Sequence, residues 1–167
     1  MNIELNSERM VIISDLHIGN PFCDISDDLI EFIYQVNDEG YDLCINGDGF
    51  DIMQTSVTQM VNELPVFMSA IKRYNRDNRN IVYVVGNHDL PLEEMISSFE
   101  GLQLCPFVNL ISGSQRIRIE HGYLYDPDFV KNPEKYEKLV HLAGIFLKIA
   151  PSLYKLWIRY EKFKNRK

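Results

Sequence analysis

Four short runs of mostly apolar residues along the chain each end at Asp, His or Asn side chains. The runs are Val11–Ser14, Leu43–Asn46, Ile81–Val85 and Ile117–Glu120. Each has the length of a strand, and the third is almost wholly apolar, as expected of a strand covered on both faces. The pattern therefore predicts four strands whose carboxyl ends carry polar side chains.

Apolar residues between the first three strands recur at helical spacing. One pattern predicts a helix over about Asp27–Asp38, capped by Ser26. A second pattern, Val57–Ile71, follows a capping box that opens at Ser56. Because Pro65 lies inside this pattern, we expect either a kink or two consecutive helices there.

The alternation of strands and helices changes in the second half of the chain. Leu90–Phe99 is predicted as a short helix, and Phe107–Ile111 with Gln115–Glu120 as a hairpin. At the other end of the chain, Ile3 and Leu5 either extend the first strand or form a short pairing strand. An antiparallel hairpin beside parallel strands indicates an α/β (α+β) protein with a mixed sheet flanked by helices.

The last third of the chain is helical from Pro133 onward, with one break at Pro151. Residues 148–167 hold seven Lys or Arg and one Glu, a net charge of +6 against −13 for residues 1–147. A basic amphipathic helix is typical of a membrane surface, and the alternative is a helix packed on its own domain. The apolar face of the last helix holds Leu153, Leu156, Trp157, Tyr160 and Phe163, and Lys155, Arg159, Lys162 and Arg166 lie opposite. We place a core at 1–130 and a helical lid or tail at 131–167.

The composition fits a globular chain of one core. Its 167 residues are 46% hydrophobic and 25% charged, and the formal net charge of −7 argues against a general nucleic-acid binder. Part of this negative charge is what a site holding two divalent cations needs. The three cysteines, Cys23, Cys44 and Cys105, share no CxxC spacing, which favours a reducing compartment, and Cys44 is expected to be a buried apolar side chain. Without a signal peptide or membrane span, we expect a cytoplasmic protein, at most peripheral to the inner membrane face.

The polar residues at the strand ends have the chemistry of a metal site. In open α/β sheets, ligands gather beyond the carboxyl ends of the strands. Asp15 and His17 follow the first strand, two residues apart, so an extended backbone would direct both to one side. Further oxygen and nitrogen donors follow the other strands, namely Asp48, Asn87 and His121. Such donors without thiolate suit two divalent cations, with Mn²⁺ favoured and Fe, Zn or Mg also compatible.

A pair of cations bridged by the Asp48 carboxylate can clamp a phosphoryl group and activate a water. His88 would stand at the rim, able to protonate a leaving oxygen, with Asp89 orienting its ring. Taken singly, each motif has a structural interpretation: Gly-Asp is a turn signal, and His121 resembles an ordinary buried histidine. His141, on the later helix, has no donor-rich neighbours and keeps the structural interpretation. The metal hypothesis rests on the ordered set of strand ends.

The ordered motifs resemble those of the calcineurin-like metallophosphoesterases. They are Asp15-Leu16-His17, Gly47-Asp48-Gly49-Phe50-Asp51, Gly86-Asn87-His88-Asp89 and His121-Gly122, within residues 9–125. The resemblance implies a two-layer β sandwich flanked by helices and hydrolysis of a phosphoester or phosphoanhydride. It also implies roles: Asp15, His17 and Asp48 for one metal, Asp48, Asn87 and His121 for the other, and His88 with Asp89 as the acid pair.

The segment Glu120-His121-Gly122-Tyr123, followed by helices, is similar to the UDP-2,3-diacylglucosamine diphosphatase branch. That branch has a helical lid that grips acyl chains at a membrane surface, although it commonly has arginine where His88 stands. A phosphorylated small molecule or a lipid-linked substrate is therefore expected.

The family's final Gly-His-x-His motif does not occur after His121, so the fold is expected to be C-terminally incomplete. Either a longer polypeptide or pairing in a homo-oligomer would complete it. Two functions follow: a metal-dependent hydrolase, or a catalytically weak or inactive metal-binding or scaffold module derived from one.

Overall fold

The computed structural model describes residues 3–20, 26–52, 54, 57–95, 98–99 and 101–164, so predictions about Cys23 and Ser56 fall outside it. The chain forms two compact units, Met1–Tyr123 and Leu124–Lys167. The boundary between residues 130 and 131 stays a prediction. Each unit is described below by itself.

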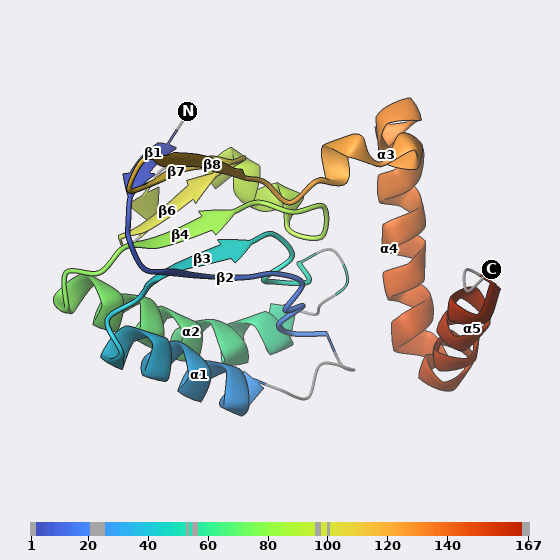
Figure 1. The fold of residues 1–167 in the computed structure, drawn as a ribbon. Coiled ribbons are helices and arrows are strands. Elements are labelled where there is room, and N and C mark those ends of the chain that lie inside the picture. The colour runs from blue at the N-terminus through green and yellow to red at the C-terminus, as the bar shows by residue number, and fades with distance from the viewer. Residues whose placement is uncertain are drawn as a thin grey trace. The chain divides into compact units, whose positions relative to one another are not determined.

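The first unit is built on a five-stranded sheet in the order β2-β3-β4-β6-β5 (Figure 1). Four strands are parallel to their neighbours, and β5 runs antiparallel to β6 at one edge. The bounds are Met10–Ile13 for β2, Asp42–Asn46 for β3, Ile81–Val84 for β4, Ser98–Phe99 for β5 and Leu102–Cys105 for β6. Adjacent parallel strands bring their carboxyl ends to one edge of the sheet.

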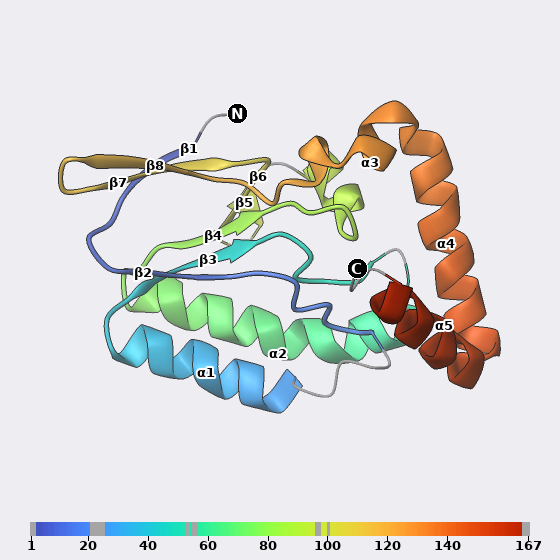
Figure 2. The same cartoon turned by 45° about the vertical axis from the view of Figure 1, so that its right-hand side comes forward.

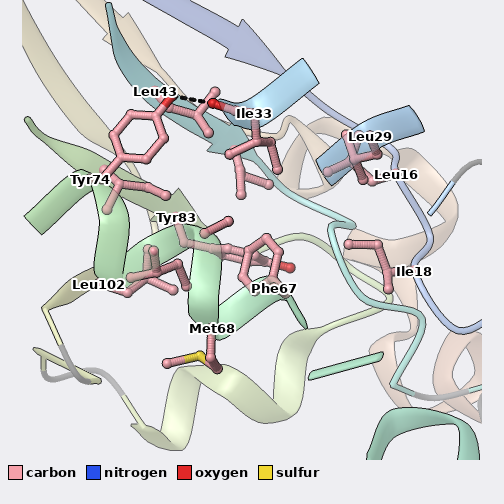
Figure 3. Packing of buried hydrophobic residues seen from close by; sticks show 14 of the residues in the cluster. Leu16, Ile18, Leu29, Ile33, Leu43, Phe67, Met68, Tyr74, Tyr83 and Leu102 are labelled. Carbon is pink, nitrogen blue, oxygen red and sulfur yellow. Dashed lines mark hydrogen bonds between the residues drawn. The ribbon is translucent and has the colours of Figure 1, made fainter. Parts of the chain in front are cut away.

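Two helices, α1 (Ser26–Asp38) and α2 (Val57–Arg76), cover one face of this sheet (Figures 1 and 2). Alternate strand residues such as Leu43 and Tyr83 point into the core on the helix side. Ile33 of α1 and Tyr74 of α2 are fully buried in the same core. The Tyr74 hydroxyl donates a hydrogen bond to the Ile33 carbonyl oxygen at 3.3 Å, which joins the two helices (Figure 3).

A second, three-stranded sheet packs on the other face of the first. Its order is β1-β7-β8, with β1 (Ile3–Asn6) parallel to β7 (Val108–Ser112) and β7 antiparallel to β8 (Gln115–Ile119). Its inner side chains share a core with alternate residues of the first sheet, among them Ile3, Leu5, Val108, Leu110, Cys44, Val82 and Val84. The central strands are thus apolar on both faces, which explains their continuous apolar runs. The predicted mixed sandwich flanked by helices is confirmed.

Several predicted elements are correct in place, but some differ in kind. The hairpin is confirmed as β7 and β8, and Ile3 and Leu5 belong to a separate strand, β1. The helix predicted over Leu90–Phe99 is wrong: Leu90–Met95 is a 3₁₀ helix, η1, and Phe99 pairs with Leu102 in the sheet. Strand pairing overrides the local pattern there. The strand β6 was not predicted, and α2 is one helix with Pro65 inside it, not two.

The second unit is helical and comprises α3 (Pro127–Lys131), α4 (Pro133–Ile149) and α5 (Pro151–Lys164). A short 3₁₀ turn, η2 (Tyr123–Tyr125), precedes it. The Asn132 side chain accepts a hydrogen bond from the Lys135 backbone N–H at 3.0 Å and caps α4. The predicted break at Pro151 is confirmed. Across the part of the chain that the structure describes, no helix is long and apolar enough to cross a membrane.

The core between the first sheet and its two helices can be tested through the free energy of unfolding. Ile33→Ala removes a fully buried side chain from α1, and we expect it to lower the free energy of unfolding by about 2–5 kcal/mol. Phe32→Ala is the matched control, because Phe32 is the neighbour of Ile33 on the same helix and is 40% exposed. This substitution should lower the free energy of unfolding by less than about 1 kcal/mol. Urea unfolding followed by circular dichroism measures both, and equal losses would contradict the assignment of the core face.

Candidate metal centre

The predicted donor residues follow four strands whose ends meet at one edge of the sandwich. Asp15, Asp48 and Asn87 come after β2, β3 and β4, which are neighbours in the first sheet. His121 comes after β8 of the second sheet. A hydrogen bond from the Asn46 side-chain amide to the Glu120 carbonyl oxygen, 3.2 Å long, holds the β8 end against the β3 end. Residues more than a hundred positions apart are thereby brought to one place.

Three of these residues adopt left-handed backbone conformations. Asp15, His17 and Asp48 have φ angles of 56°, 49° and 52°. The extended backbone predicted for Asp15 and His17 is therefore wrong, since β2 ends at Ile13. Left-handed φ costs of order 1–2 kcal/mol for a residue with a Cβ, and such strain gathers at functional sites. Backbone hydrogen bonds hold the loop: Asp15 N–H donates to the Gly47 carbonyl at 3.1 Å, and His17 N–H to the Asp48 carbonyl at 2.8 Å.

One group of donors forms around His121. The ligand atoms of Asp15, Asp48 and His121 lie within 4.8 Å of one another. His121 Nδ1 lies 2.9 Å from the Asn46 carbonyl oxygen, which can only accept, so Nδ1 carries a proton. His121 Nε2 then lies 3.1 Å from Asn87 Oδ1 and 3.4 Å from Asp48 Oδ2.

A second group forms around His17. The ligand atoms of His17, Asp48 and His88 lie within 4.8 Å of one another, and the two imidazole rings stand edge to face at 4.8 Å between centroids. Asp48 belongs to both groups. The structure thus brings together all five predicted metal ligands, but it places Asp15 with His121 and places His88 beside His17.

His88 has a different carboxylate partner from the one predicted. His88 Nδ1 lies 3.0 Å from Asp51 Oδ1, and Asp51 is fully buried. Asn20 donates a hydrogen bond to the other Asp51 oxygen at 2.7 Å, which fixes the carboxylate. Asp51 was not predicted as a functional residue, and its only sequence signal was its place at the end of the Gly47–Asp51 motif.

The carboxylate of Asp89 accepts hydrogen bonds mainly from backbone N–H groups. This corrects the prediction that it orients the His88 ring. Its oxygens accept hydrogen bonds from the Gly49 N–H at 3.1 Å, the Gly86 N–H at 2.5 Å and the Tyr83 hydroxyl. Asp89 is fully buried and so joins the loop after β3 to the loop after β4. It positions two of the four loops that carry the donors.

Two glycines leave room for donor side chains. A Cβ on Gly47 would lie 2.3 Å from the His121 ring, and a Cβ on Gly86 would lie 2.2 Å from Asp48 Oδ1. Both distances are far below van der Waals contact. Gly47 also has a φ of +79°, which favours glycine.

A model of the calcineurin-like phosphoesterases matches residues 8–164. The chain belongs to this family. No curated protein matches the chain. Membership supports a hydrolase that uses metal ions on phosphoesters, and the family's divalent metals are consistent with the two donor groups at the strand ends. The narrower resemblance to the UDP-2,3-diacylglucosamine diphosphatases stays a prediction.

The electrostatics of this site favour a positive charge near the Asp48 carboxylate. The hydrogen bond to Asp48 raises the pKa of His121 to about 9 against the opposing effect of burial. Burial acts to raise the pKa of Asp48, but hydrogen bonds from His121 and the His88 backbone lower it overall, so this carboxylate stays ionised. Burial acts to lower the pKa of His88, and Asp51 reverses this and raises it.

The donor set fits divalent cations. His121 Nε2 faces two oxygen atoms, an arrangement that needs a proton or a cation to be stable. His17 Nδ1 is buried without a hydrogen-bond partner and lies 3.8 Å from Asp51 Oδ2. Carboxylate, amide and imidazole donors suit the metals named from the sequence, whose identity stays a prediction.

Gly47 provides a test of the site. We expect Gly47→Ala to weaken Mn²⁺ binding at least about tenfold, because the added Cβ displaces the His121 ring. Gly113→Ala is the matched control: Gly113 also has a positive φ, +57°, but the nearest atom to an added Cβ is 4.0 Å away. Equilibrium dialysis with elemental analysis measures both. Equal Mn²⁺ affinity in the two variants would show that His121 does not bind the metal.

Proposed function

We propose that this protein hydrolyses phosphoester or pyrophosphate bonds with a dinuclear metal site. The observation that carries the proposal is the place of Asp48, which is ionised, almost wholly buried and shared by both donor groups. A carboxylate has two oxygens and can bridge two cations. Membership of the phosphoesterase family supports the same reaction class.

The two donor groups suggest how the ligands are divided. His17 and Asp48 would hold one cation, and Asp48, Asn87 and His121 the other, with Asp15 beside His121. Bound there, two divalent ions supply a water of lowered pKa and neutralise the charge of the phosphoryl oxygens. Mn²⁺ is the metal we favour for this set of donors.

The chain's own residues supply the proton. Asp51 accepts a hydrogen bond from His88 Nδ1, which orients the ring and leaves Nε2 for the leaving oxygen. Because Asp51 raises the pKa of His88, the imidazolium form that donates this proton is stabilised. His88 would act as the general acid, and Asp51 takes the orienting role first predicted for Asp89.

A second function is a metal-binding or scaffold module with little turnover. It is favoured by the small size of the donor groups, each of which holds three His or Asp residues among those that the structure describes. Metal content distinguishes the two functions: such a module would bind metal in a partly filled site and hydrolyse no phosphate.

Donors of this kind suit the hydrolysis of phosphomonoesters, phosphodiesters and pyrophosphates alike. The substrate is therefore proposed only by class. A lipid-linked phosphate is supported by the resemblance of Glu120–Tyr123 and its following helices, and a small phosphorylated molecule is the alternative.

Hydrolysis rates and metal content together distinguish a metal ligand, such as Asp48, from the proposed general acid, His88. We expect hydrolysis of p-nitrophenyl phosphate or bis-p-nitrophenyl phosphate with added Mn²⁺. Asp48→Ala should abolish both turnover and metal binding, because it removes the shared ligand. His88→Ala should lower kcat about 10²–10⁴-fold, the usual contribution of a general acid, and leave the metal content unchanged.

His141→Ala is the control, since this histidine is exposed on α4 and lies outside both donor groups. Equal rates in wild type and all three variants would overturn the proposed function. Loss of metal in His88→Ala would instead make His88 a ligand and leave the acid unassigned.

A further inference from the structure

The helical unit exposes a large apolar surface on α4 and α5. Single exposed apolar residues are common on proteins, but a contiguous set marks an interaction site. The exposed residues of α4 recur at helical spacing and are Leu139, Leu142, Ile145, Phe146 and Ile149, 41–78% exposed. Those of α5 do the same and are Leu153, Leu156, Trp157, Tyr160 and Phe163, 47–76% exposed. We call these ten residues the apolar stripe.

Packing between the two helices leaves this stripe uncovered. Tyr154 is only 8% exposed, and its ring centroid lies 6.5 Å from Phe146 and 5.6 Å from Trp157. Gly144 of α4 is buried as well. The helices thus meet where Tyr154 packs against Phe146, while most of the surface of the other large aliphatic and aromatic side chains remains open to solvent.

Positive charge accompanies the apolar stripe. Lys155 and Arg159, one turn apart on α5, are exposed. Residues 148–167 carry a net +6 in a chain whose total is −7. An amphipathic helix with Trp and Tyr on its apolar face and Lys and Arg on its polar side is typical of the boundary between headgroups and acyl chains of an anionic bilayer.

The first unit offers no matching apolar partner among its described residues. The large apolar residues exposed on the first unit are Ile12, Phe32, Val66 and Ile117, which lie on four different elements. None is more than 47% exposed. No described helix can span a bilayer, so the helices would lie on its surface.

We propose that α4 and α5 dock on anionic phospholipid surfaces through the apolar stripe, with Lys155 and Arg159 contacting the headgroups. This surface does not depend on the proposed hydrolysis. It would hold the protein at a membrane whether or not the pocket turns over.

Trp157 is the only tryptophan and lies within the stripe, so its fluorescence reports docking directly. The full chain is mixed with vesicles of phosphatidylcholine alone, or of phosphatidylcholine with 30% phosphatidylglycerol. We expect a blue shift of emission and co-sedimentation with the anionic vesicles, both weakened in 0.5 M NaCl. No blue shift, or equal binding to neutral vesicles, would overturn the proposal.

Charge variants identify the surface. Leu156→Glu should lower partitioning onto anionic vesicles at least about tenfold, and Arg159→Glu about tenfold, since each basic residue near such a surface contributes about 1 kcal/mol. Phe32→Glu is the matched control, because it places the same acid at an exposed apolar position of α1. Unchanged binding in Leu156→Glu, or a dimer in sedimentation equilibrium that Leu156→Glu dissociates without any vesicle binding, would contradict the proposal. The second result would assign the stripe to a second copy.

Discussion

The burial of the Asp48 carboxylate is the constraint on which the rest of the site depends. This side chain is 3% exposed yet ionised, and a buried charge needs compensation from its surroundings. The His88 backbone N–H donates to one oxygen at 2.8 Å, and His121 Nε2 approaches the other at 3.4 Å. Gly86 leaves the room that this carboxylate occupies. His88 and His121 therefore compensate the charge of Asp48, and Gly86 makes space for it.

Rigid connections keep these neighbours in place before any ligand arrives. The left-handed backbone at Asp15, His17 and Asp48 is held by hydrogen bonds between the loops after β2 and β3. Asp89 joins the loops after β3 and β4 through two backbone N–H groups and Tyr83. A site preorganised in this way spends little of its binding free energy on ordering the protein. The loops after β3 and β4 leave strands whose residues are almost all buried, which fixes the positions at which Asp48 and Asn87 enter the site.

The sequence was sufficient to predict the strand ends and the polar residues that follow them, since apolar runs and polar ends are local features. It could not predict which carboxylate meets His88, because the choice between Asp51 and Asp89 depends on how two separate turns face each other. The left-handed turn at Asp15 and His17 was missed for the same reason, as was the way that the donors divide into two groups. The strands β5 and β6 were missed because pairing defines them: β6 pairs with β4, and β5 pairs with β6.

The exposed apolar helices and the buried, charged site have separate roles, and the site determines the chemistry of the chain. The most direct test is electron paramagnetic resonance of the Mn²⁺-loaded protein with metal counted in parallel. We predict two Mn²⁺ ions per chain whose spectrum shows spin coupling through a shared ligand, with the coupling lost in Asp48→Asn. At most one bound ion per chain, or two uncoupled ions that Asp48→Asn does not disturb, would contradict a site bridged by Asp48.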